Sequence, residues 1–107
     1  MNSTSTTMNI SPRAGMLLTK MVKTPDPEIA LWKILSEYTD LKTNMLKQQI
    51  KAFESKWKGT FEEFAERCQT ETLGVDPYAY EVESDFWEWE KAETLLQHYK
   101  KLQIQWM

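Results

Sequence analysis

The sequence predicts an all-α domain of one long helix and two shorter helices, completed as a helical hairpin or bundle by dimerisation. Apolar residues recur at helical spacing in two long stretches, and Gly and Pro stand only at the ends of these stretches. Residues suited to capping precede each predicted helix. A chain of 107 residues has room for one core, and we place this single helical domain at residues 25–107.

Residues 1–24 are predicted to form a flexible N-terminal arm. The segment is rich in Ser and Thr, contains Arg13, Lys20 and Lys23, and has no acidic residue. An organelle transit peptide has a similar composition, and it stays open as an alternative. A later translational start is the other alternative, at one of the methionines Met8, Met16 and Met21.

The long helix is predicted over residues 27–58. Pro27 suits the first turn, where the backbone N–H of a residue has no partner, and Asp26 can cap the helix. The apolar residues fill half of the helix surface, which is wider than one coiled-coil seam. We therefore expect one flank to pack within the chain and another against a second copy. The predicted oligomer contacts are Leu31, Leu35, Tyr38, Met45, Leu46 and Phe53.

A short helix is predicted between Gly59 and Gly74. Thr60 and Glu63 form a capping box, in which the hydroxyl and the carboxylate each accept from a free backbone N–H. One face of this helix carries Phe61, Phe64, Ala65 and Cys68. Because no His or other Cys is near Cys68 in sequence, we interpret it as a small core residue and not as a nucleophile.

The last helix is predicted to begin at Ser84 or Asp85, where Asp85 and Glu88 form a second capping box. Its apolar stripe consists of Trp89, Ala92, Leu95, Leu96, Tyr99, Leu102 and Trp106. Phe86 and Trp87 fall outside this stripe. Either they pack as a satellite cluster under the preceding loop, or they are exposed to a partner.

The segment from Glu81 to Glu93 combines six carboxylates with three aromatic rings and one lysine. Aromatic side chains supply contact area and nearby charges steer encounter, as in many protein-binding surfaces. A helix N-terminus also favours carboxylates, but this effect fades beyond the first turn and accounts only for Asp85 and Glu88. We therefore expect a protein partner with a basic surface. The predicted partner-binding residues are Glu81, Glu83, Phe86, Trp87, Glu90 and Glu93.

The formal charge of −3 is distributed unevenly. Residues 1–60 hold nine basic and five acidic residues, a balance of +4, whereas residues 61–107 hold four and eleven, a balance of −7. Direct nucleic-acid binding is not expected, because it requires basic residues clustered on one face. No stretch is apolar enough to span a membrane. The single cysteine rules out an internal disulfide and favours a cytoplasmic location.

Patterns typical of enzymes are absent from the sequence. It has no Gly-rich phosphate loop, no nucleophile elbow and no repeated Cys/His spacing. His98 lies on the polar flank of the last helix and is interpreted as a surface residue. Glu81 and Glu83 could bind a divalent ion, but this spacing of carboxylates is common by chance. We predict no catalytic residues, no cofactor and no metal.

The motifs Lys58-Gly59, T-F-E-E-F at 60–64 and Y-E-V-E-S-D-F-W-E-W-E at 80–90 occur in that order, with Gly74 between the last two. In this respect residues 45–100 resemble a family of small prokaryotic antitoxin-like proteins of toxin–antitoxin systems. The resemblance implies a helical protein that neutralises a partner, a possible toxin, by direct contact and without catalysis. The alternative is a structural adaptor that assembles through its long amphipathic helix.

Overall fold

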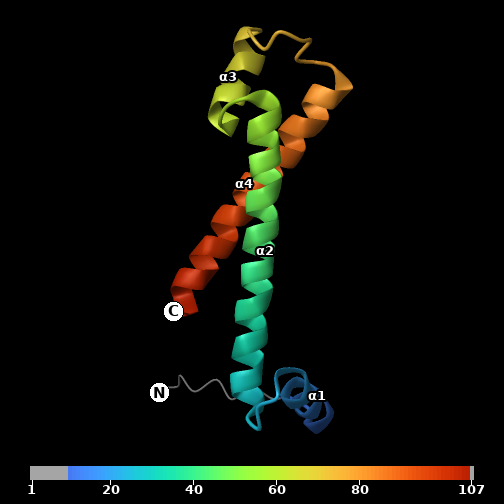
Figure 1. Ribbon diagram of the computed structural model, residues 1–107, viewed down its shortest axis with the longest axis vertical. Helices are drawn as coiled ribbons and strands as arrows, with labels where there is room; N and C mark the ends of the chain where they lie inside the picture. Colours follow the sequence, from blue (N-terminus) through green and yellow to red (C-terminus); the bar gives the residue numbers. More distant parts are fainter. Residues whose placement is uncertain (1–9, 107) are drawn as a thin grey trace. The chain divides into compact units, whose positions relative to one another are not determined.

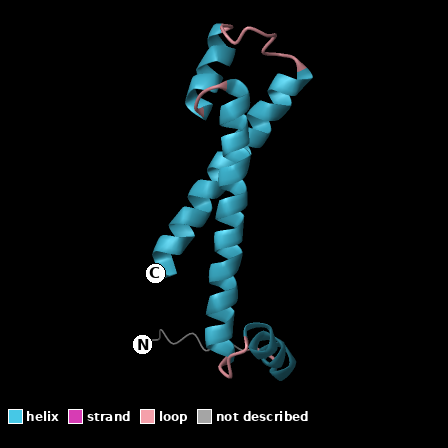
Figure 2. Ribbon diagram, in the orientation of Figure 1, coloured by secondary structure: helices cyan, strands magenta, loops and turns pink. Residues whose placement is uncertain are grey.

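The computed structural model describes residues 10–106, which form four α-helices and no strand (Figures 1 and 2). The helices are α1 (Pro12–Val22), α2 (Pro27–Trp57), α3 (Phe61–Thr70) and α4 (Tyr80–Trp106). The prediction of an all-α fold is confirmed. The chain divides into two compact units, Met1–Tyr38 and Thr39–Met107, and α2 belongs to both.

Helix α1 was not expected, because it lies in the segment predicted as a flexible arm. Its start has a local cause, since the Ser11 hydroxyl accepts from the Ala14 N–H at 3.2 Å and Pro12 stands at the first helical position. It ends at Val22, and the next residue, Lys23, adopts a left-handed conformation with φ 57°. Gly15 is buried, and a Cβ atom there would lie 3.6 Å from Pro27. Residues 1–9 of the predicted arm lie outside the described residues.

The predicted long and short helices correspond to α2 and α3. Helix α2 ends one residue earlier than predicted, before Lys58 with φ 55°. The predicted capping box is confirmed, with Glu63 N–H donating to the Thr60 hydroxyl at 3.2 Å and Thr60 N–H to the Glu63 carboxylate at 2.8 Å. These bonds, led by the one from the backbone, lower the pKa of Glu63. Helix α3 ends before Glu71, which has φ 57°.

The predicted start of the last helix is wrong. Helix α4 begins at Tyr80, four residues before Ser84, and its 27 residues make it nearly as long as the 31-residue α2. A turn at Asp76 leads into the helix, with the Asp76 carboxylate accepting from Tyr78 N–H at 3.0 Å. Asp85 therefore lies inside α4 and cannot form the predicted N-terminal capping box with Glu88.

The hydrophobic core of the second unit lies where α4 runs back beside α2 and α3 packs near the end of α2 (Figure 1). Trp89 and Phe64 are fully buried at its centre. The Trp89 ring stacks on Phe53 at a centroid distance of 5.5 Å. The remaining buried members are Leu46, Ile50, Val82, Ala92 and Leu96. The apolar stripe predicted for the last helix is confirmed from Trp89 to Tyr99, whose members belong to this core or pack against it, and Leu102 is half-buried.

Candidate functional site

A groove of about 440 Å³ lies between α3, the loop before α4 and the first turns of α4. Most of its lining is apolar. Three of the predicted partner-binding residues line it, namely Glu83, Phe86 and Trp87. Tyr78 also lines the groove and is 77% exposed. Tyr78 is not among the predicted partner-binding residues, although its place in the loop directly after Asp76-Pro77 is a signal for an exposed side chain.

Phe86 and Trp87 have different environments, and Phe86 packs against the main core instead of forming a satellite cluster with Trp87 under the preceding loop. Phe86 is half-buried, with its ring 5.1 Å from Phe61 and 6.2 Å from Phe64. Trp87 is 63% exposed and touches the Phe86 ring in an edge-on contact at 5.7 Å. Phe86 therefore packs against α3 while it lines the groove, and Trp87 presents most of its surface to solvent.

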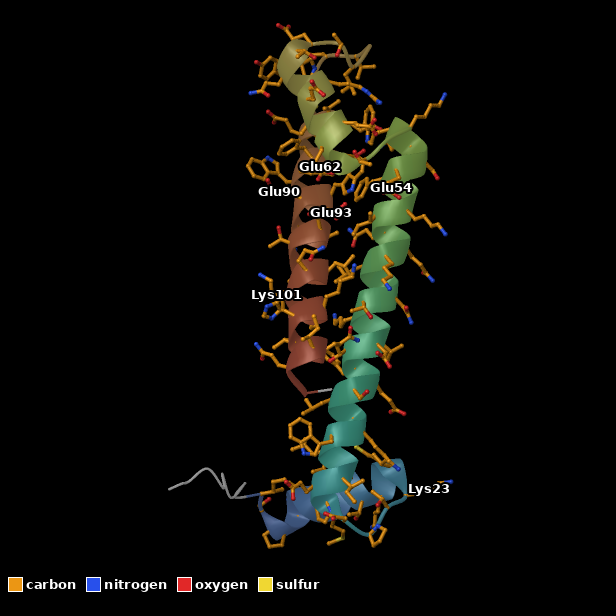
Figure 3. All side chains as sticks on the ribbon, turned by 90° about the vertical axis from the view of Figure 1, so that its left-hand side faces the viewer. Lys23, Glu54, Glu62, Glu90, Glu93 and Lys101 are labelled. Atoms are coloured by element: carbon orange, nitrogen blue, oxygen red, sulfur yellow. The ribbon has the colours of Figure 1, made fainter. Side chains whose placement is uncertain are left out.

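Two carboxylates flank Trp87 along α4. Glu83 precedes it by four residues and Glu90 follows it by three, so the three side chains follow one line on the helix surface. All three are exposed. Figure 3 shows Glu90 turned away from α2. We call Glu83, Trp87 and Glu90 the acidic face.

Glu81 lies on a different side of α4 from the acidic face. Its carboxylate accepts from Lys56 Nζ at 2.7 Å, and Asp85 accepts from the same atom at 2.6 Å. Asp85 also accepts from Trp57 Nε1 at 3.0 Å. The hydrogen bonds from Lys56 to Asp85 and to Glu81 raise the pKa of the Lys56 ammonium. Glu81 therefore helps to join the start of α4 to the end of α2.

Glu93 is hydrogen-bonded to the core residue Trp89. Its carboxylate accepts from Trp89 Nε1 at 3.3 Å, which gives the buried indole a hydrogen-bond partner. Burial raises the pKa of Glu93, and the carboxylates of Glu62 and Glu54 raise it further, whereas the Trp89 bond and Lys100 lower it. Figure 3 shows Glu93 turned toward α2, on the side where Glu54 and Glu62 also lie.

The predicted oligomer contacts are not all available to a second copy. Leu46 is buried, and Phe53 stacks on Trp89, so both contribute to the core of the chain itself. The exposed fraction is 60% for Met45, 50% for Tyr38 and 37% for Leu35. Leu31 is half-buried. Leu41, which was not selected, is 63% exposed.

The other candidate residues have no arrangement that suggests catalysis. His98 is exposed, and its ring lies edge-on to Tyr99 at 5.6 Å. Cys68 is half-buried at the groove, and burial raises the pKa of its thiol, which disfavours the reactive thiolate. Across residues 10–106, no three His, Cys, Asp or Glu side chains gather as metal ligands would. In the same range, no helix has the length and apolar character to cross a membrane.

Comparisons of the chain with protein-family models, with curated proteins and with solved structures found no match. The function is therefore inferred from the groove, the acidic face and their surroundings. These features combine exposed aromatic rings with carboxylates beside an apolar recess, a combination that is common in protein-binding surfaces.

Proposed function

We propose that this chain is a non-enzymatic, antitoxin-like module that neutralises a partner protein with a basic surface by direct contact. The observation that carries the proposal is Trp87, whose indole is 63% exposed between two carboxylates and beside an apolar groove. An exposed tryptophan costs a folded protein solubility, whereas in an interface it supplies a large contact area.

The carboxylates of Glu83 and Glu90 give the interaction its charge preference. Negative groups spaced along a helix can occupy positions that the phosphates of a nucleic acid would otherwise take on a basic surface. The partner class that fits best is therefore a toxin with a basic, RNA-binding face. We place the binding of this partner in the cytoplasm, where the free Cys68 stays reduced.

The test is affinity purification with the full chain as bait in its native host at low salt, with mass spectrometry of the captured proteins. We expect Trp87→Ala to weaken capture of the specific partner, by about 2 kcal/mol or more in a direct titration. Glu88→Gln is the matched control, because Glu88 is exposed but lies outside the acidic face. Equal capture by the parent chain and Trp87→Ala would show that the interface lies elsewhere.

A second candidate function is that of a structural adaptor that assembles through α2. Two exposed apolar side chains favour it, Leu41 at 63% and Met45 at 60%, which stand four residues apart and so share one side of the helix. In this case Leu41→Ser with Met45→Ser should abolish assembly, whereas Trp87→Ala should leave assembly unaffected. Light scattering coupled to gel filtration distinguishes the two functions.

A further inference from the structure

Helix α1 carries a line of side chains that matches the acidic face in spacing and opposes it in charge. Arg13, Leu17 and Lys20 stand at intervals of four and three residues, so they follow one line along the helix. Arg13 and Lys20 are exposed, and Leu17 is 55% exposed. The opposite side of α1 is occupied, because Gly15 is buried against Pro27. We call Arg13, Leu17 and Lys20 the basic face.

The two faces have the same internal spacing. In each, two like charges are seven residues apart, about 10.5 Å along a helix, with an apolar side chain between them. Two helices lying side by side in this register form two opposite-charge pairs and one Leu–Trp contact at the same time. The charges can pair with the helices in either relative direction, because the spacing between them is equal.

We propose that the basic face of one copy docks on the acidic face of a second copy, with one of the two methionines that flank the basic face, Met16 or Met21, entering the groove. The side chains of both faces are exposed, and every copy carries one face of each charge, so two copies can supply the complementary pair. Within residues 10–106 no salt bridge uses the four charged residues of these faces. Met16 and Met21 are 54% and 71% exposed, and their flexible thioether side chains suit an irregular apolar recess.

A lipid surface is a poorer occupant for the basic face. Around the axis of α1, Arg13 and Lys20 lie in the middle of the exposed side, with Met16 on one flank and Met21 on the other. A helix that inserts into a membrane interface keeps its basic residues on the polar side and its apolar residues together. Here insertion of the two methionines would draw both charges into the apolar layer.

This inference uses the acidic face of the proposed function but does not depend on the partner. It adds that a second copy and the partner compete for one surface. Self-association and partner binding are therefore mutually exclusive. A copy must dissociate from the second copy before its acidic face can bind the partner.

The test is a charge exchange in the full chain. Arg13→Glu with Lys20→Glu makes both faces acidic, and Glu83→Lys with Glu90→Lys makes both basic. Each double variant alone should self-associate at least about tenfold more weakly than the parent chain at low salt, because like charges then oppose each other. Its mass by light scattering should approach that of the 12.7 kDa monomer. An equimolar mixture of the two variants should regain association, since every basic face then meets an acidic one.

The pair Leu41→Ser with Met45→Ser on α2 is the control, and it should associate like the parent chain. The inference is wrong if the parent chain is a monomer at all concentrations, if the mixture stays monomeric, or if only the α2 control loses association. Binding of anionic vesicles that requires Arg13 and Lys20, with the protein monomeric, would also overturn it. The Arg13→Glu, Lys20→Glu variant keeps the acidic face, so its capture of a partner tests the proposed function independently.

Discussion

Trp87 and Trp89 are two residues apart in the sequence, yet they have opposite roles. Trp89 is fully buried, stacks on Phe53 and donates to Glu93, whereas Trp87 is 63% exposed. The helical period separates them, because Trp89 falls on the apolar stripe of α4 and Trp87 does not. The period does not place Phe86, whose half-buried position depends on the rings of Phe61 and Phe64 from α3.

The first prediction compares the two tryptophans. Trp89→Ala should lower the free energy of unfolding by about 3–5 kcal/mol, because it leaves a cavity at the centre of the core. Trp87→Ala should change it by less than about 0.5 kcal/mol, as is usual for surface substitutions. Urea unfolding followed by circular dichroism measures both. Similar destabilisation by the two changes would contradict the structure.

The second prediction concerns the pH dependence that Glu93 contributes. Because its pKa is raised in the folded state, the folded chain holds this proton more tightly than the unfolded chain. Stability from this group therefore increases as pH falls from the raised pKa toward the ordinary value of 4.5, and it is lost as pH rises through the raised pKa. Ionised Glu93 destabilises the fold at neutral pH.

Glu93→Gln should stabilise the fold at pH 7, by less than about 1 kcal/mol because solvent screens a partly exposed group. The Gln side-chain oxygen can still accept from Trp89, so the core bond is preserved. Denaturant titrations of both chains between pH 4.5 and pH 7 make the comparison. Parallel pH profiles would mean that Glu93 does not titrate as described.

At the scale of elements, the starts of α2 and α3 depend on local sequence, whereas the start of α4 involves a contact with the distant end of α2. The starts of α2 and α3 were predictable because capping and periodicity are local properties. The start of α4 was not, since Asp85 has the sequence pattern of a cap. Its carboxylate instead accepts from Lys56 and Trp57, and the Trp57 partner is 28 residues away in sequence. The groove beside α4 was unpredictable for the same reason, because it is formed between separate elements.

The third prediction tests this contact. Asp85→Ala removes the acceptor of a part-buried Trp57 N–H and one partner of Lys56, and it should destabilise the fold by about 1–2 kcal/mol. Glu81→Ala removes only the more exposed partner and should cost much less. Thermal unfolding of the two variants provides the measurement. If Asp85 capped a helix start as its sequence pattern suggests, Asp85→Ser would preserve stability, whereas the contact with Trp57 predicts a loss.

At the scale of the whole molecule, one of the two units contains nearly all of the buried apolar side chains within the described range. The core cluster, centred on Trp89 and Phe64, consists entirely of residues in the unit Thr39–Met107. In the unit Met1–Tyr38, Gly15 and Ala30 are the buried residues within the described range. Local stability follows the number of buried apolar contacts, so the two units should open independently and at different cost.

The fourth prediction is a difference in amide hydrogen exchange. Amides of α1 should exchange far faster than amides of α4 around Trp89, because few buried apolar groups hold α1 in place. Hydrogen exchange with mass spectrometry at low protein concentration measures the chain without self-association. Protection of α1 that appears only at high concentration would agree with docking on a second copy, and equal protection of both helices at low concentration would contradict the prediction.

Three of the helix ends have a common feature with a consequence for engineering. Lys23, Lys58 and Glu71 all adopt left-handed backbone conformations, with φ between 55° and 57°, where an L-residue with a Cβ is disfavoured by about 1–2 kcal/mol. Glycine adopts this conformation without that penalty. Glycine substitutions at these three positions should therefore stabilise the chain, and none of the three residues lines the groove or belongs to either face. A more robust version for crystallisation or long-term assays can be obtained there without altering any surface discussed for binding.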